Sequence, residues 1–332
     1  MMKKYDVTGI GSPLLDITFD VNENLLLELG LKKGEMKLID RNKSVELLSK
    51  LNNYSSQVSP GGSASNTIAG ISSLGGKTVF LGKLGQDNHG NIYEEKTKNE
   101  GVYAILPKHP NEITGHAITF ITPDFERTFA THLGASQYFT KEDVSEEAIK
   151  DSKILHLEGY QLASEELKKA VFHAAKIAKE NNTTISLDLS DAGLVKNNLN
   201  LFKEFVKEYV DIIFANETEA QAFSGKEGEE ALKEISKICN IVVVKLGEQG
   251  SLIKANDIIY KIPSYKTKVV NTNGAGDMYS AALLYGITNN LDLEKAGKIA
   301  SYSASLVVGK PEARYGKGLK EKIDDFVSEN KL

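Results

Sequence analysis

The sequence predicts an α/β protein in which a mainly parallel central sheet is covered by helices. Short β-branched runs alternate with segments of helical periodicity along most of the 332 residues. Most of these runs are apolar throughout, as expected for strands that are buried on both faces. Hydrophobic residues make up 41% and charged residues 26% of the chain, so a compact globular fold is expected.

Six apolar runs are predicted to be strands of this sheet: residues 7–10, 78–81, 153–156, 184–187, 211–214 and 241–244. Apolar residues at helical spacing predict a crossover helix near 165–181. The same periodicity predicts a helix that begins near Met278 and a second one over 293–308, both packed on the core.

Two stretches interrupt the alternation of strands and helices, at about 12–40 and 102–122. Within the second, residues 117–121 are predicted to form a strand without a neighbouring helix. These stretches could pair as a small separate sheet that acts as a lid, or they could extend the main sheet as edge strands. Because the sequence has no internal repeat or Pro-rich linker, we expect a single domain over residues 1–332, with the lid as its appendage.

Charge and composition exclude several classes of function. The formal net charge of −5 argues against a nucleic-acid partner, which needs a surplus of Lys and Arg. The longest apolar runs fall short of the roughly 18 residues that span a membrane. The single cysteine, Cys239, excludes an intramolecular disulfide, and the N-terminus has no signal-peptide core, so a cytoplasmic protein is expected. The chain could be a monomer or a homodimer.

The strongest local motif is the segment Asn271–Asp277, directly before a predicted helix. Gly274 and Gly276 allow a tight turn with exposed N–H groups, and the helix start adds its positive dipole end. Such a turn is an anion hole, and Asp277 at its mouth could accept a proton from an attacking hydroxyl. The alternative is a structural glycine turn with Asp277 as an ordinary acidic residue at a helix start.

Three further segments lie at strand ends or helix starts, where an open α/β sheet places its binding crevice. Residues 61–66 precede a predicted helix, and Asn66 there could hydrogen-bond a diol. Asp16 follows the first strand, and Asn216 and Glu219 follow another, where their oxygens suit Mg²⁺ held through water. Each has a structural alternative as a helix cap or a solvated turn residue.

Together, in this order and at these separations, the four segments resemble those of the ribokinase-like (PfkB) carbohydrate and nucleoside kinases. The resemblance extends from about Tyr5 to beyond Val308. It implies a three-layer α/β/α fold with a small β-lid. It also implies transfer of the γ-phosphoryl group from ATP with Mg²⁺ to a primary hydroxyl, with a requirement for a monovalent cation left open.

The same resemblance implies a role for individual residues. Those at the reacting groups are Asp277 as general base, Gly274, Ala275 and Gly276 as the anion hole, and Arg127 at the transferring phosphate. Those that hold the acceptor are Asp16, Gly62, Ser65 and Asn66. Those on the nucleotide side are Asn216, Lys245, Gly247 and Glu219, of which Glu219 would hold Mg²⁺ through water.

Within the family, residues 34–40 and the region 122–135 look most like the bacterial adenosine-kinase-like branch. We therefore expect the 5′-hydroxyl of adenosine or another purine nucleoside as the first acceptor. Two positions depart from the pattern: Asn271 replaces a usual Asp, and Ala192 and Gly193 stand where that branch tends to carry an aromatic residue.

Three other functions stay open beside the nucleoside kinase. A sugar kinase of the same fold, similar to ribokinase or fructokinase, is the main alternative. A sugar-binding regulator without activity would be expected to lose the base, yet Asp277 is present. A nicotinamide-dependent oxidoreductase is disfavoured because the turn after the first strand lacks the third glycine of the Gly-x-Gly-x-x-Gly motif.

Overall fold

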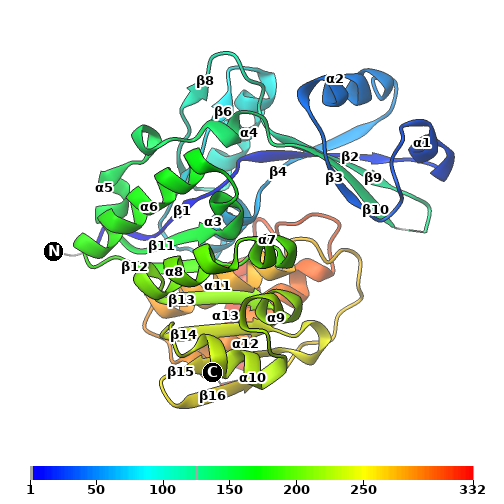
Figure 1. Cartoon of the computed structure of the whole chain (residues 1–332). Coiled ribbons are helices and arrows are strands. Elements are labelled where there is room, and N and C mark those ends of the chain that lie inside the picture. Colours follow the sequence, from blue (N-terminus) through cyan, green and yellow to red (C-terminus); the bar gives the residue numbers. More distant parts are fainter. Residues whose placement is uncertain (1–2, 125, 332) are drawn as a thin grey trace.

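The computed structural model describes residues 3–124 and 126–331, and its framework is a large sheet of nine strands (Figure 1). The strand order is β16-β15-β14-β13-β12-β11-β1-β5-β7. From β14 to β7 all neighbours are parallel, whereas β15 and β16 are antiparallel additions at one edge. The strands are β1 (Tyr5–Ile10), β5 (Thr78–Leu81), β7 (Tyr103–Ile105), β11 (Ser152–Glu158), β12 (Thr184–Asp188), β13 (Ile212–Asn216), β14 (Ile241–Lys245), β15 (Ser251–Ala255) and β16 (Ile258–Ile262). All six predicted runs lie in this sheet, so the prediction of a mainly parallel sheet is confirmed.

Helices cover both faces of the large sheet and complete a three-layer α/β/α arrangement (Figure 1). One face carries α3 (Ser63–Ser73), α11 (Ala275–Thr288), α12 (Leu293–Val308) and α13 (Leu319–Glu329). The other carries α5 (Glu146–Lys150), α6 (Glu165–Glu180), α8 (Leu199–Tyr209), α9 (Glu217–Ser224) and α10 (Gly228–Ile235). Adjacent strand residues belong to opposite cores, Ile212 to the first and Ile213 to the second, because side chains alternate along a strand. Further elements are α4 (Asn88–Asn99), α7 (Ala192–Asn197), and the two-stranded pair β6 (Leu84–Gly85) and β8 (Lys108–His109).

A separate five-stranded sheet, of order β3-β10-β9-β2-β4, projects from the large one as a lid (Figure 1). Its strands are β2 (Leu14–Asp20), β3 (Met36–Leu38), β4 (Ser56–Gly61), β9 (His116–Ile121) and β10 (Arg127–His132). The helices α1 (Glu23–Glu28) and α2 (Arg41–Lys50) lie over it. Along β2, Leu15, Ile17 and Phe19 are buried, whereas Asp16, Thr18 and Asp20 occupy the other, less buried face.

The separate lid confirms one of the two alternatives for the interrupting stretches, but their predicted limits of 12–40 and 102–122 are wrong. Tyr103–Ile105 joins the large sheet beside β5. Conversely, β4 and β10 lie outside the predicted stretches yet pair with β2 and β9. The pairing of β4 with β2 and of β10 with β3 joins segments that are distant in sequence, so it leaves no local signal and depends on which edges the fold brings together.

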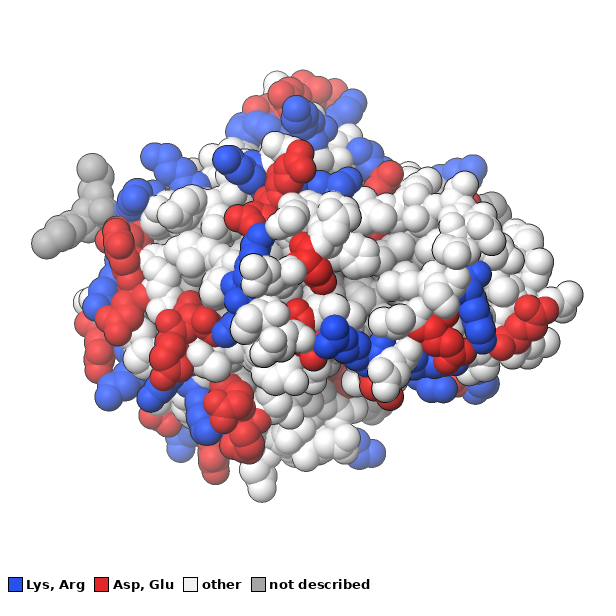
Figure 2. Space-filling view, turned by 90° about the horizontal axis from the view of Figure 1, so that it is seen from above, with Lys and Arg blue, Asp and Glu red and all other residues white. Residues whose placement is uncertain are grey.

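The predicted helices are found with small shifts of their ends. The helix expected near Met278 begins earlier, at Ala275, because Gly274 already forms its N-cap. No helix within the described ranges has both the length and the apolar character needed to span a membrane. On the face seen in Figure 2, Lys and Arg side chains are interleaved with Asp and Glu.

Candidate active site

Polar residues end four adjacent parallel strands at the same edge of the large sheet. Glu158, Asp188, Asn216 and Lys245 are the last residues of β11, β12, β13 and β14. Each follows an apolar run that is buried between the helix layers, so the polar side chains emerge where the layers open. Ligands of open α/β sheets bind beyond these carboxyl ends.

Asp277 lies in the first turn of α11, facing the first turn of α3. One carboxylate oxygen accepts a hydrogen bond from Ser63 Oγ at 2.8 Å, and the other accepts one from Asn66 Nδ2 at 2.9 Å. Burial raises the pKa of Asp277, and the bonds from Asn66 and Ser63 oppose that rise. A buried carboxylate with a raised pKa is a stronger proton acceptor than an exposed one, so the geometry suits a general base.

Two glycines bring the loops around Asp277 into close contact. Gly274 has φ +79°, and a Cβ atom there would lie 2.1 Å from the carbonyl oxygen of Ala313. Gly62 has φ +94°, and a Cβ atom there would lie 2.1 Å from the carbonyl oxygen of Ser12. Neither position accommodates a side chain. The turn at Gly274 presents the first amides of α11 at the crevice, where the predicted anion hole requires them.

Lys245 forms a buried ion pair with Asp188, at 2.8 Å between Nζ and Oδ2. The same Asp188 oxygen also accepts a hydrogen bond from Ser280 Oγ at 3.3 Å. Lys245 Nζ lies beside the glycine turn, since a Cβ atom on Gly276 would be 3.2 Å from it. The lysine therefore places a positive charge next to the predicted anion hole. Gly247, at φ +56°, follows β14 in an open turn.

Asn216 and Glu219 form a capping box at the start of α9. The Glu219 carboxylate accepts from the backbone N–H and from Nδ2 of Asn216, both at 2.8 Å. Burial raises the pKa of Glu219 to about 7, and the nearby Asp188 carboxylate adds to the rise while Lys245 opposes it. Within residues 3–124 and 126–331 no cluster of three or more His, Cys, Asp or Glu side chains is arranged to hold a metal ion. This donor set fits Mg²⁺ held through water and phosphate oxygens.

Asp16 and Arg127 reach the crevice from the lid. Burial raises the pKa of Asp16 to about 6, Arg314 and Arg127 oppose the rise, and Asp277 adds to it. Arg127 Nη2 donates to the carbonyl oxygen of Pro311 at 3.2 Å. A cleft of about 340 Å³ lies here, lined by Thr18, Asp20, Ser55, Ser56, Gln57, Ile121, Arg127, Val270 and Pro311.

Two predicted residues have internal partners instead of an open position. Ser65 Oγ is bonded to Tyr93 Oη at 2.5 Å and accepts from Arg314 Nη2 at 2.8 Å. Asn271 is buried, and its Nδ2 donates to the Pro311 carbonyl at 2.8 Å. The aspartate that the family usually carries there could not donate this bond, so the departure at Asn271 gives the loop at Pro311 an internal hydrogen bond.

Three site residues were not found from the sequence. Glu158 accepts from the backbone N–H of Ser12 at 3.0 Å and of Ala64 at 2.7 Å, which ties the β1–β2 turn to the start of α3. Glu158 and Asp188 are both polar residues at the end of a strand, β11 and β12. This pattern is visible in the sequence and could have identified both as site residues. Arg314 lies in the loop between α12 and α13, and nothing in its sequence context points to the site.

Comparison with known proteins gives a family match and full-length relatives. Residues 32–318 match the family described as pfkB family carbohydrate kinase. The 5-dehydro-2-deoxygluconokinase of Bacillus licheniformis is 28% identical over 98% of this chain and 97% of its own. A probable sugar kinase from Rhizobium etli is 31% identical, with a TM-score of 0.90 over 98% of this chain and 99% of its own. The adenosine kinase from Sinorhizobium meliloti is 32% identical, with a TM-score of 0.89 over 97% of this chain and 99% of its own.

Proposed function

Because the chain belongs to the pfkB family of carbohydrate kinases, we propose that it transfers the γ-phosphoryl group of ATP to a primary hydroxyl of a small sugar-type acceptor. It is a phosphotransferase with an alcohol group as acceptor. The observation that carries the proposal is the position of Asp277, a partly buried carboxylate at the first amides of α11 and at the carboxyl edge of the sheet.

In the proposed reaction Asp277 accepts the proton of the acceptor hydroxyl while that oxygen attacks the γ-phosphorus. The bond between the γ-phosphorus and the bridging oxygen of ADP breaks. Negative charge on the transferring group is stabilised by the amides of Gly274, Ala275 and Gly276, and Arg127 supports it from the lid. Asn66 and Ser63 hold the carboxylate in place during the transfer.

The nucleotide side has residues suited to ATP and Mg²⁺. Mg²⁺, when bound, neutralises charge on the phosphate oxygens. Glu219 and Asn216 would hold it through water, because their direct hydrogen-bonding positions are largely used within the capping box. Lys245 adds a fixed positive charge beside the glycine turn.

The polar lining of the cleft supports a sugar-type acceptor. Hydroxyl, amide and carboxylate side chains predominate there, and none of its lining residues is aromatic. Such a surface satisfies many hydroxyl groups of the acceptor but offers no ring for a base to stack on. Two curated relatives that match 98% and 86% of this chain are named 5-dehydro-2-deoxygluconokinase. The sequence-based prediction placed adenosine first, and these observations support its sugar alternative better.

A purine nucleoside remains the second candidate, and one feature of the lid favours it. Met36 and Leu38 on β3 are 56% and 61% exposed, and Met36 pairs with Phe129 of β10. Phe129 is two residues from Arg127 and therefore on the same face of the sheet. An apolar patch on this face could contact a base.

A panel of acceptors distinguishes the two candidates. We expect ATP consumption with a higher kcat/KM for a pentose, hexose or sugar acid than for adenosine, inosine or guanosine. A preference for a nucleoside would reassign the acceptor and leave the kinase in place. Absence of ATP-dependent phosphorylation across the panel would contradict the proposed function.

Asp16→Asn is expected to weaken acceptor binding and to remove part of its pH dependence. Loss of a charged hydrogen-bond acceptor in a buried site costs about 1–3 kcal/mol, or roughly 5-fold to 150-fold in affinity. Since the pKa of Asp16 is raised to about 6, its ionised form is lost as the pH falls through that value. In the unmodified enzyme kcat/KM for the acceptor should therefore fall below about pH 6, and this part of the profile should be absent in Asp16→Asn.

The control is Asp324→Asn on α13, whose carboxylate lies in an exposed ion pair with Lys320. It should leave both acceptor binding and the pH profile unchanged. Calorimetry that finds ATP binding and acceptor binding equally weakened by Asp16→Asn would contradict the assignment to the acceptor.

A further inference from the structure

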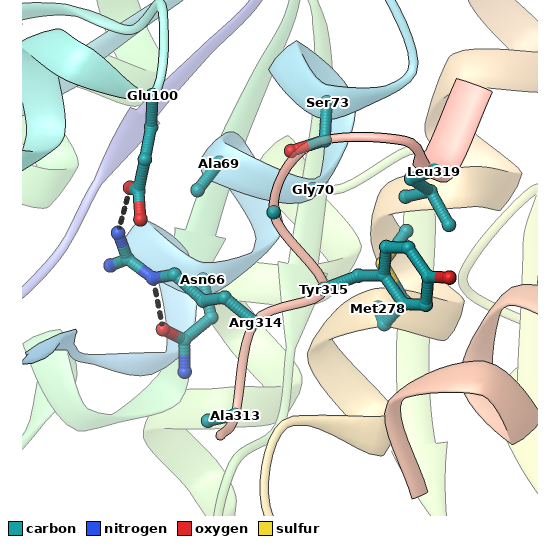
Figure 3. A pocket seen from close by; sticks show the side chains of 11 residues that line it. Asn66, Ala69, Gly70, Ser73, Glu100, Met278, Ala313, Arg314, Tyr315 and Leu319 are labelled. Carbon is teal, nitrogen blue, oxygen red and sulfur yellow. Dashed lines mark hydrogen bonds and ion pairs between the residues drawn. The ribbon is translucent and has the colours of Figure 1, made fainter. Parts of the chain in front are cut away.

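Arg314 is a buried arginine whose contacts converge on the end of β4 and the first turn of α3, and the proposed reaction does not use it directly. Its side chain is 9% exposed and pairs with the Glu100 carboxylate through Nη1. Nη2 donates to Ser65 Oγ at 2.8 Å and to the Gly61 carbonyl oxygen at 3.4 Å. Nε donates to Asn66 Oδ1 at 2.8 Å, as Figure 3 shows.

The amide of Asn66 lies between Arg314 and the catalytic base. Its oxygen accepts from Arg314, and its nitrogen donates to Asp277 Oδ2 at 2.9 Å. A rotation of the amide by a half-turn would set its oxygen against the Asp277 carboxylate and its NH₂ group against the guanidinium. Two charge-assisted hydrogen bonds would be replaced by two repulsive contacts, so the guanidinium permits one orientation of the amide.

We propose that Arg314 is a positioning residue that holds the Asn66 amide in the orientation in which its nitrogen donates to Asp277. The inference rests on the proposed function only in taking Asp277 as the base. To hold this orientation, a hydrogen-bond donor must be fixed beside the Asn66 amide oxygen, on the side away from Asp277. Glu100 and Ser65 orient the guanidinium so that Nε points to the amide oxygen.

The loop that carries Arg314 also contacts the lid. Three residues earlier, the Pro311 carbonyl accepts from Arg127 on β10 and from Asn271 before the glycine turn. One short segment therefore touches a lid strand, the anion-hole loop and, through Asn66, the base. Its position allows Arg314 to keep Asn66 aligned when the lid is in contact with the core.

A consequence of the alignment is a lower pKa of Asp277 than burial alone would produce, because the Asn66 bond favours the carboxylate. The other charged groups near Asp277 are Lys245 and Asp188 on the sheet, Glu158 at the end of β11, and Asp16 on the lid. Without Arg314 only the Asp277 carboxylate itself orients the amide, so the hydrogen bond from Asn66 should weaken and the pKa of Asp277 should rise. The charge of Arg314 also lowers the pKa of Asp16, and the test has to separate the two effects.

The first test is a double-mutant cycle of Arg314→Met and Asn66→Ala, with kcat measured across pH at saturating ATP and acceptor. Arg314→Met alone should move the acid limb of kcat to higher pH by about one unit, so that kcat on that limb falls roughly tenfold. When Asn66→Ala is already present, adding Arg314→Met should change kcat and the acid limb little, because the amide that links Arg314 to Asp277 is missing. Equal effects of Arg314→Met in both backgrounds would overturn the inference.

Two further variants separate positioning from structural support. Glu100→Gln removes the charge of the ion pair but keeps a side-chain oxygen that accepts from Nη1, so the guanidinium stays oriented and Nε stays on Asn66. The variant should lower thermal stability without moving the acid limb. Arg314→Lys keeps a charge near Asp16 and Glu100 but cannot engage Glu100 and Asn66 at once, so it should fold and still show the shift. A shift in Glu100→Gln equal to that of Arg314→Met would contradict the proposal.

A readout that needs no activity keeps this inference separate from the proposed function. Carbon-13 NMR of Asp carboxyl groups, with Asp277 assigned by Asp277→Asn, reports its pKa in the free protein. We expect a higher value in Arg314→Lys than in the unmodified protein. An unchanged pKa would overturn the role of Arg314 even if the kinase is active, and an inactive protein with the expected shift would overturn only the proposed function.

Discussion

Replacement of Asp277 by asparagine is expected to lower kcat by about 10²–10⁴-fold, the usual contribution of a general base. The change preserves the shape of the side chain but removes the carboxylate that accepts the proton. Ser63 Oγ and Asn66 Nδ2, which donate to this carboxylate, would face an amide, and one of the two bonds is retained by a suitable rotamer. Binding of ATP and acceptor should change much less than turnover.

Steady-state kinetics at saturating substrates measures this effect, and calorimetry checks that both ligands still bind. Asp324→Asn is the matched control, because Asp324 lies in an exposed ion pair with Lys320 on α13, on the surface. It should leave kcat unchanged. If Asp277→Asn retained turnover within a few-fold of the unmodified enzyme, Asp277 would not be the base.

Lys245→Met is expected to destabilise the fold by about 3–5 kcal/mol, because it leaves the buried Asp188 carboxylate without its cation. The side chains of Lys245 and Asp188 are only 15% and 6% exposed, so water compensates poorly for the lost partner. The Asp188 carboxylate would still accept a hydrogen bond from Ser280 Oγ, but this bond stabilises the buried charge less than the ion pair with Lys245 does. Such a loss is a large share of the 5–15 kcal/mol that typically separates folded and unfolded states.

Urea denaturation measures the change, and two variants calibrate it. Lys233→Met removes a cation that is 46% exposed and pairs with Glu229 and Glu230, so it should cost less than about 1 kcal/mol. The double variant Lys245→Met with Asp188→Leu removes both buried charges and should recover part of the stability. A loss in Lys245→Met no greater than in Lys233→Met would mean that the pair contributes little to the fold.

Local features of the sequence were sufficient for much of the fold and for the centre of the candidate site. Buried parallel strands are apolar throughout, and amphipathic helices repeat their apolar residues at fixed spacing, so both are visible within short windows. The glycine turn before α11 is equally local, since the φ of +79° at Gly274 favours glycine whatever the turn contacts. Asp277 follows directly from that turn, and its position at the helix start was therefore predicted.

Other parts of the molecule were decided only by the tertiary structure. The lid strand β4 pairs with β2, and β10 pairs with β3, about 40 and 90 positions earlier in the chain, so no short window contains both partners. Asp188 and Lys245 become an ion pair because β12 and β14, with β13 between them, end at the same edge of the sheet. Arg314 reaches Asn66 across 248 positions of the chain. By itself the sequence determined which segments form strands, helices and the glycine turn, because these depend on near neighbours. Contacts between distant side chains depend on how the packed elements meet, and only the folded chain decides them.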